Sequence, residues 1–198
     1  PVKLEFTSIF PPEGGNLRPL SDIIGEKKNF QQWIGIAPFA AHQGKILPTE
    51  KTEELIKEIS RRHPSCRIFL FGGGEKEHAV LNAWCERYNN CTNASQALSS
   101  LKEEMVVMSH LDVMVSMDSG NMHLAAISGT RVISVWGETH PYAGFLGWNQ
   151  RPEDCIQADL PCRPCSIYGN KPCQRGDYAC LTSIDPITIA DKVDWSLN

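Results

Sequence analysis

The sequence predicts an α/β fold in which a parallel sheet is covered by helices. Short apolar runs, too short to be helices, alternate along the chain with segments whose apolar residues recur at helical spacing. This alternation is typical of β-α-β units and therefore of a parallel sheet. Glycines and polar residues that could bind a ligand follow three of these apolar runs, in the loops 39–47, 72–77 and 118–123. In a parallel sheet these loops open on one edge, which is where open α/β sheets bind ligands.

Length and composition exclude several classes of protein. The chain has 198 residues, of which 41% are apolar, and a net charge of −4. This length suits one sizeable domain with a packed core. Because there is no basic block, we expect no nucleic-acid partner. We find no signal-peptide pattern and no apolar run near the roughly 18 residues of a membrane span. We therefore expect a cytoplasmic protein with at most peripheral membrane association.

The expected elements follow in order. Residues 1–32 show little periodicity and are interpreted as a lead-in to a domain at 33–198. Strands are expected at 33–38, 66–71, 112–117, 131–136 and 155–160. Helices are expected from about 49, at 76–88 and 98–109, from about 120, and at 185–193.

The central stretch joins a buried strand to a helix. The strand at 112–117 runs into Asp118-Ser119-Gly120, and His123 follows in the first helical turn. A helix N-terminus at the carboxyl end of a parallel strand presents unpaired N–H groups and a partial positive charge, which favours an anion and usually a phosphate. The alternative is an ordinary helix cap with a solvated histidine, and these residues alone do not decide between the two.

The other two loops are less specific. Lys45 is the only Lys or Arg in the loop 39–47, so it is a candidate phosphate contact or simply a solvated cation. Glycines 72–74 precede Glu75 and allow close backbone approach by a ligand. They do not form G-x-G-x-x-G, so a dinucleotide fingerprint is absent. Glu75 could also serve only as an acid complementing the helix dipole.

Eight cysteines are more than usual. Cys66, Cys85 and Cys91 lie among apolar segments and suit buried free thiols. In a reducing compartment metal binding ranks above disulfides for clustered cysteines. The Cys-rich loop 155–182 has the spacing C-x2-C-x7-C-x6-C, which allows a tetrahedral structural zinc site formed by Cys162, Cys165, Cys173 and Cys180. The alternative is a set of reduced thiols beneath an irregular loop.

Four motifs lie at these loops, and the cysteine run follows them in the sequence. They are Ala37-Pro38 through Lys45-Ile46-Leu47-Pro48, Phe71-Gly72-Gly73-Gly74-Glu75, Asp118-Ser119-Gly120 through His123-Leu124-Ala125-Ala126, and Trp136-Gly137-Glu138-Thr139-His140-Pro141. Over about residues 33–193 the sequence resembles glycosyltransferase family 9, the bacterial heptosyltransferases that build the lipopolysaccharide inner core. It departs from that family in Phe39–Gly44 and at Leu47.

The resemblance implies the GT-B architecture, in which two Rossmann-like domains enclose the active site. In that family the N-terminal domain binds the acceptor and carries the catalytic carboxylate, and the C-terminal domain binds the nucleotide sugar. This chain resembles only the C-terminal domain. We therefore expect half of an enzyme, with the catalytic base and the glycolipid acceptor supplied through the other domain, at the inner face of the inner membrane.

The implied reaction is inverting transfer from an ADP-heptose-like nucleotide sugar, with no cofactor required for catalysis. The expected roles are diphosphate contacts, ribose contacts from an acid at position 75 or 77, and sugar contacts or orientation of the helix turn from position 118. The expected donor-binding residues are Lys45, Gly73, Glu75, Glu77, Asp118, Ser119, Gly120, His123, Gly137 and Thr139. The alternatives are a nucleotide-sugar epimerase, a non-catalytic sugar-nucleotide-binding domain and a zinc module for protein interaction.

Overall fold

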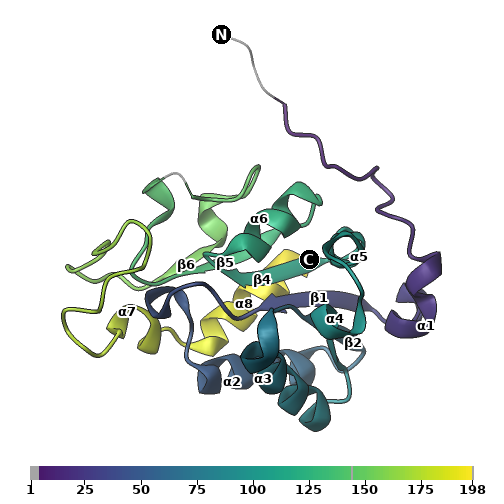
Figure 1. The fold of residues 1–198 in the computed structure, drawn as a ribbon, viewed down its shortest axis with the longest axis horizontal. Helices are drawn as coiled ribbons and strands as arrows, with labels where there is room; N and C mark the ends of the chain where they lie inside the picture. Colours follow the sequence, from purple (N-terminus) through teal and green to yellow (C-terminus); the bar gives the residue numbers. More distant parts are fainter. Residues whose placement is uncertain (1–4, 144, 198) are drawn as a thin grey trace.

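The core of the protein is a fully parallel sheet with helices on both faces (Figure 1). The computed structural model describes residues 5–143 and 145–197. The strand order is β3-β2-β1-β4-β5-β6, and all five neighbouring pairs are parallel. The strands are β1 Gln32–Ala37, β2 Cys66–Leu70, β3 Cys91–Asn93, β4 Val113–Met117, β5 Val132–Trp136 and β6 Cys155–Gln157. The predicted α/β fold is confirmed.

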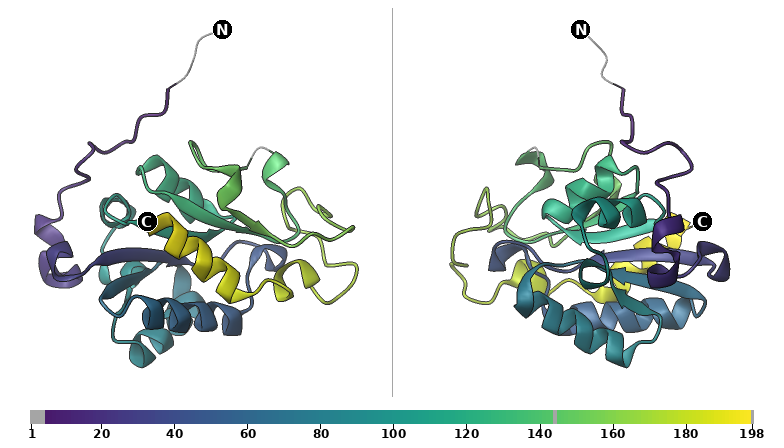
Figure 2. Two further views of the ribbon diagram at one scale, coloured as in Figure 1. Left: turned by 180° about the vertical axis from the view of Figure 1, so that it is seen from behind. Right: turned by 45° about the vertical axis from the view of Figure 1, so that its right-hand side comes forward.

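Helices cover the two faces of the sheet as separate layers (Figures 1 and 2). Along β1, Ile34 and Ile36 enter one core cluster, whereas Trp33 enters the other. Because both faces are buried, the strands are almost continuously apolar rather than alternating. One layer consists of α2 Thr49–Arg62, α3 Gly74–Arg87 and α8 Pro186–Leu197, and the other contains α5 Leu101–Met108 and α6 Gly120–Ile127.

Short elements complete the chain. They are η1 Arg18–Leu20, α1 Ser21–Ile24, η2 Lys27–Asn29, η3 Gln43–Lys45, α4 Ala94–Ala97, η4 Pro141–Ala143, η5 Pro152–Asp154 and α7 Ala179–Thr182. Within the described residues, no helix is long and apolar enough to cross a membrane.

Two of the differences from the predicted elements have a local explanation. The helix expected at 98–109 begins only at Leu101, because the Ser100 side chain accepts a hydrogen bond from the Glu103 amide and starts the helix there. The short strand β3 was not predicted. It has three residues, too few for a periodic signal, and it is defined by pairing with β2.

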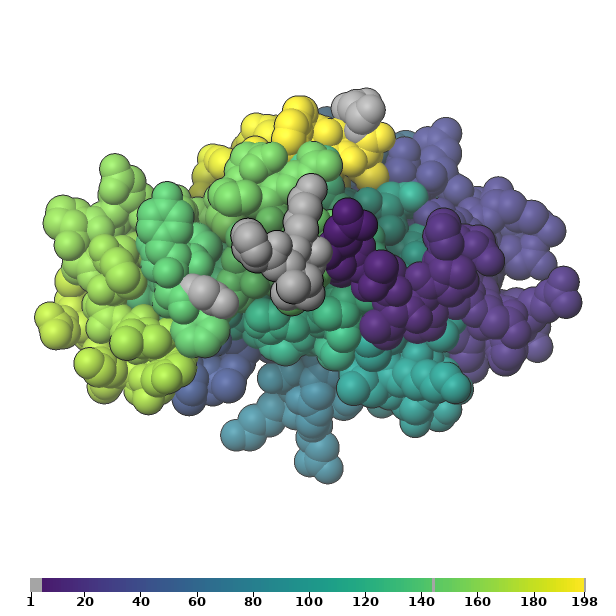
Figure 3. Space-filling view, turned by 90° about the horizontal axis from the view of Figure 1, so that it is seen from above, coloured from purple at the N-terminus to yellow at the C-terminus, as the bar shows by residue number. Residues whose placement is uncertain are grey.

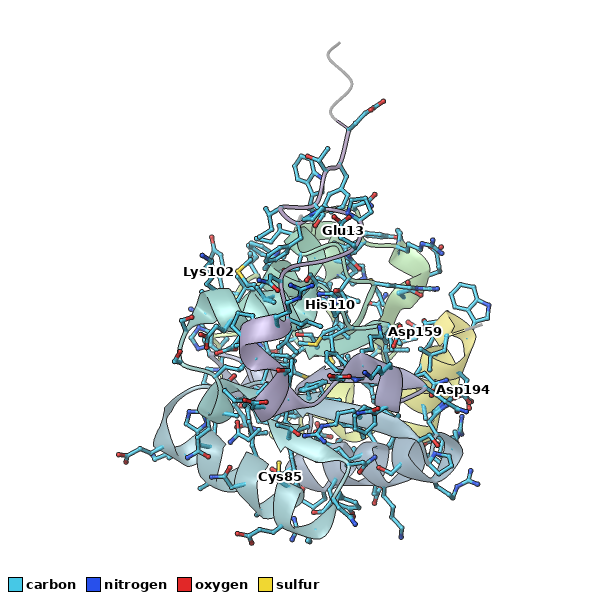
Figure 4. All side chains as sticks on the ribbon, turned by 90° about the vertical axis from the view of Figure 1, so that its right-hand side faces the viewer. Glu13, Cys85, Lys102, His110, Asp159 and Asp194 are labelled. Carbon is cyan, nitrogen blue, oxygen red and sulfur yellow. The ribbon has the colours of Figure 1, made fainter. Side chains whose placement is uncertain are left out.

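The lead-in contributes to the core; its residues 1–4 lie outside the described residues. Leu20 and Ile24 are buried with the α5 and α6 cluster. The Ile9 amide donates to the Ile127 carbonyl at 3.0 Å, and His110 Nε2 lies 2.7 Å from the Gly15 carbonyl (Figure 4 labels His110). The space-filling view shows this segment lying across the α5 and α6 side (Figure 3). Contacts made by residues 8–24 therefore pack this part of the lead-in against that face.

Candidate functional site

The carboxyl ends of β1, β4 and β5 bring three polar side chains together. Lys45 Nζ lies 3.1 Å from Asp118 Oδ2, and the two side chains are only 15% and 5% exposed. The Thr139 hydroxyl donates to the same oxygen at 2.8 Å, and Thr139 is fully buried. Asp118 is thus held from two sides at the entrance to α6, and it fixes the position of the Lys45 ammonium group.

The N-terminus of α6 lies beside the Lys45 ammonium group and is not capped by a side chain. Ser119 occupies the N-cap position but makes no capping hydrogen bond with its side chain. A Cβ added at Gly120 would meet nothing within 4 Å. The first amides of a helix have no partner within it, so this end can receive an anion. His123 is in the first turn, as the sequence predicts.

These residues line one cavity of about 230 Å³. It unites five of the residues predicted from the sequence with four that the sequence analysis did not single out. Its lining consists of Ala41, Lys45, Asp118, Ser119, Gly120, His123, Phe145, Ile167 and Tyr168. The convergence of the 39–47 and 118–123 loops therefore produces a real concavity.

The loop after β2 does not line this cavity. Glu77 Oε2 accepts from the Gly73 amide at 2.7 Å, so this carboxylate helps to cap α3. Glu75 is exposed. A Cβ at Gly73 would meet nothing within 4 Å, so its backbone remains approachable. Since β2 is the neighbour of β1, these residues lie one loop further along the same edge.

The Gly137–Thr139 loop packs against the loop that carries Lys45 and does not itself line the cavity. A Cβ at Gly137 would overlap the Gly44 carbonyl oxygen, so the chains can approach this closely only with glycine there. The Glu138 amide donates to that carbonyl at 2.9 Å. The Glu138 side chain is fully buried, and burial raises the pKa of its carboxyl group. A Cβ at Gly44 would overlap this carboxyl, so Glu138 packs behind the lysine loop and does not face the cavity.

Residues 20–173 match the model of glycosyltransferase family 9 (heptosyltransferase). The chain belongs to glycosyltransferase family 9. Among curated relatives, lipooligosaccharide heptosyltransferase 2 of Campylobacter jejuni (strain 81116) is 20% identical over 84% of this chain and 52% of its own length. Lipopolysaccharide heptosyltransferase 1 of Campylobacter coli is 30% identical over 62% of this chain and 35% of its own. The chain thus spans about half the length of the relatives it matches, or less.

Solved structures show the same fold. E. coli ADP-heptose lps heptosyltransferase II superposes with a TM-score of 0.64 at 21% identity, over 84% of this chain and 46% of that one. An E. coli heptosyltransferase with ADP gives a TM-score of 0.60 at 19% identity, over 85% and 45%. A dodecameric iron-containing heptosyltransferase, TibC, gives 0.57 at 14% identity, over 83% and 45%. The fold is therefore that of about half of each heptosyltransferase chain.

In this family 9 chain the Cys-rich loop packs directly against the site. The Arg163 guanidinium donates to the carbonyls of Gly137 at 2.5 Å, Ala158 at 2.5 Å and Thr139 at 3.0 Å. The amide of Cys165 donates to the Glu138 carbonyl at 3.2 Å. These bonds fasten the loop to the segment that carries Gly137 and Thr139.

All eight cysteines are free, as predicted for Cys66, Cys85 and Cys91, although Cys85 is only partly buried. In the clustered set, burial raises the pKa of Cys180 to about 11, and Cys162 is exposed. Across residues 5–143 and 145–197, no three potential ligands gather closely enough to hold a metal ion. The zinc site at Cys162, Cys165, Cys173 and Cys180 therefore stays a prediction from spacing.

Proposed function

We propose that this chain is the nucleotide-sugar-binding domain of an inverting glycosyltransferase that uses an ADP-heptose-like donor in lipopolysaccharide or cell-surface glycan synthesis. The observation that supports this most strongly is the Lys45–Asp118 pair at the uncapped N-terminus of α6, inside one cavity. One E. coli neighbour, heptosyltransferase WaaC, is described in two structures, with ADP and with ADP-2-deoxy-2-fluoro heptose. Membership of the heptosyltransferase family makes the same donor class the first to test here.

The proposed binding mode follows from charge. The diphosphate of the donor accepts hydrogen bonds from the first amides of α6 and from Lys45, with His123 as a further donor. The same contacts stabilise the negative charge that grows on the departing nucleoside diphosphate, which lowers the barrier to transfer. The ribose hydroxyls extend toward the β2 loop, where Glu75 is exposed and Gly73 is approachable.

We propose that the chemistry at this site is provided by these protein groups, without a cofactor, because the nearby acids do not converge on a metal-binding point. Asp118 is engaged by Lys45 and Thr139, and Glu138 is buried behind Gly44. Neither Asp118 nor Glu138 is therefore positioned as a base for an acceptor hydroxyl, which needs a group within about 2.6–3.2 Å. The base and the glycolipid acceptor are assigned to a second domain, working at the inner face of the membrane.

Calorimetric titration of the purified chain tests donor binding. ADP and ADP-heptose should bind, with weaker binding of UDP, GDP and CMP, and the preferred nucleotide should raise Tm by mass action. A transferase assay with a lipid-core acceptor should then show no turnover by the chain alone. Failure of every nucleotide to bind would refute the donor-site proposal, and robust turnover would refute the assignment of the base to another domain.

A structural metal at the four clustered cysteines is a separate proposal. It rests on their spacing within residues 162–180, where Cys180 belongs to α7 and the other three precede it, and a metal would have to draw the thiols closer than they lie now. Because a structural neighbour is described as iron-containing, both zinc and iron need to be measured. One equivalent of metal by elemental analysis, lost in Cys165→Ser but kept in Cys66→Ser, supports the site; a metal-free protein with titratable thiols contradicts it.

A further inference from the structure

One wall of the candidate donor cavity is aromatic and comes from two segments that have no assigned role in donor binding. Phe145 follows η4, and Tyr168 lies in the Cys-rich loop. Their ring centroids are 5.9 Å apart, with planes tilted by 50°. Ile167 lines the same cavity, and Tyr168 and Ile167 are 61% and 63% exposed. An apolar surface of this kind at the mouth of a polar cavity is a typical feature of a ligand pocket.

This wall is anchored on both sides of Tyr168. On one side, the amide of Ser166 donates to the Glu138 carbonyl at 3.3 Å, and the buried Ser166 hydroxyl accepts from the Gly169 amide at 2.9 Å. On the other side, Gly169 has a positive φ of 71° and lies so close to Lys45 that a Cβ would be 2.5 Å from the lysine Cγ and Cδ. Hydrogen bonds therefore hold the turn that carries Tyr168 in place, and the same turn packs against Lys45.

The position of the wall along the sheet edge indicates which part of a donor it meets. Strand order places the loops in the sequence β2, β1, β4, β5, with Glu75 after β2 and the opening of α6 after β4. Phe145 comes from the segment after β5. If the diphosphate occupies the α6 N-terminus and the ribose extends toward β2, the opposite end of the molecule extends toward β5. In a nucleotide sugar that end is the sugar.

We infer that Tyr168, backed by Phe145, forms the subsite for the donor's sugar ring. The C–H face of a hexose or heptose ring packs against the two aromatic rings, while its hydroxyls meet the polar floor at Asp118 and His123. This inference rests on the proposed function and adds to it a residue that contacts the donor's sugar but not its nucleotide. Tyr168 acts by contact with the sugar and takes no part in holding the phosphates.

Calorimetric titration with ADP and with ADP-heptose tests the inference. Tyr168→Ala should weaken ADP-heptose binding about tenfold, the scale of one lost aromatic packing contact, and leave ADP affinity within about twofold of the wild type. Tyr168→Phe should retain the wild-type affinity for both ligands, because it keeps the ring. Tyr142→Ala is the matched control, since Tyr142 is 90% exposed and packs on His140 outside the cavity.

The two ligands distinguish the possible failures. Retained ADP affinity shows that the Tyr168→Ala chain is folded and its phosphate site intact. Unchanged ADP-heptose affinity in that variant overturns the inference, and so does an equal loss for both ligands, which places the ring on the nucleotide or makes it merely structural. A wild-type chain that binds neither ligand overturns the proposed function and this inference together.

Discussion

Lys45 and Asp118 form an ion pair across two loops that are 73 residues apart in sequence, with 3.1 Å between Nζ and Oδ2. Thr139 shares that oxygen at 2.8 Å. The lysine thus has a structural partner before any ligand arrives, and a bound diphosphate would be a second anion for the same cation. Replacing Lys45 should therefore lower both the free energy of unfolding and the affinity for the diphosphate.

Lys45→Met removes the charge and keeps most of the stem that packs on Gly169. We expect ADP binding to weaken by roughly 1–3 kcal/mol, the size of a charge-assisted hydrogen bond. The free energy of unfolding should fall by about 1–3 kcal/mol, because the buried Asp118 loses its ion-pair partner. Calorimetry and urea denaturation measure the two effects. Lys171→Met, at an exposed lysine of the Cys-rich loop, is the control; equal ADP affinity in both variants would contradict the assignment.

Gly44→Ala tests the packing behind the site. The new methyl group would overlap the buried Glu138 carboxyl, so the lysine loop must shift. We expect a loss of about 1–3 kcal/mol in stability, typical of overpacking, together with weaker ADP binding. Gly73→Ala is the matched control for the stability measurement, because its methyl group meets nothing within 4 Å and its φ is −140°.

Removing the Glu138 carboxyl should reverse part of the stability loss caused by Gly44→Ala. In the Gly44→Ala background, Glu138→Ala should recover part of the lost stability, and a double-mutant cycle measures that coupling. Strictly additive losses would show that Gly44 and Glu138 do not constrain each other.

Arg163→Lys tests the attachment of the Cys-rich loop. A single ammonium group cannot reproduce the planar fork that reaches the carbonyls of Gly137, Ala158 and Thr139. We expect a lower Tm and faster proteolysis within 158–178, and weaker binding of ADP-heptose because the turn carrying Tyr168 loosens. Limited proteolysis followed by mass spectrometry locates the cut. Unchanged cleavage within this loop would argue against the anchoring role.

Acid stability reports on the contact between α2 and α8. Hydrogen bonds from Arg61 and then Arg62 lower the pKa of Glu58 from 4.5 to about 2, and Arg62 also binds Asp191 and Asp194 of α8 (Figure 4 labels Asp194). A lowered pKa stabilises the fold above the unfolded-state value, and this contribution is lost as pH falls toward 2. Glu58→Gln should therefore flatten the stability profile between pH 4.5 and about 2, whereas Glu54→Gln, at an exposed position of α2, should not.

High salt adds a second check on the same cluster. Exposed ion pairs are screened at about 1 M salt, so the difference between wild type and Glu58→Gln should shrink there. A difference that persists unchanged would mean that Glu58 acts through packing instead of charge.

The parts of the fold that follow from local pattern were predictable. The apolar run 113–117 predicts a strand because it is too short for a helix, and Asp118-Ser119-Gly120 after it predicts a helix start. Because all parallel strands end at the same edge, the meeting of Lys45 with the α6 entrance could be expected without coordinates.

Other features depend on contacts that no local pattern records. Tyr168 and Phe145 are 23 residues apart, and neither belongs to a motif that predicts a role. Glu138 lies in a loop at the carboxyl end of β5, where a carboxylate is expected to face solvent, yet tertiary packing buries it completely. The sequence signal for this turn is Gly169, which follows Tyr168 directly, because glycine favours a tight turn at that point.

The measurement that tests the central claim most directly is an NMR titration of the isotope-labelled chain with ADP. Binding at the α6 N-terminus predicts saturable amide shifts at Ser119, Gly120 and His123 and in the Lys45 loop, all with one dissociation constant. Shifts confined to another region, such as the groove beside Glu13 and Lys102, would contradict the claim that this sheet edge holds the nucleotide, and so would the absence of any saturable shift.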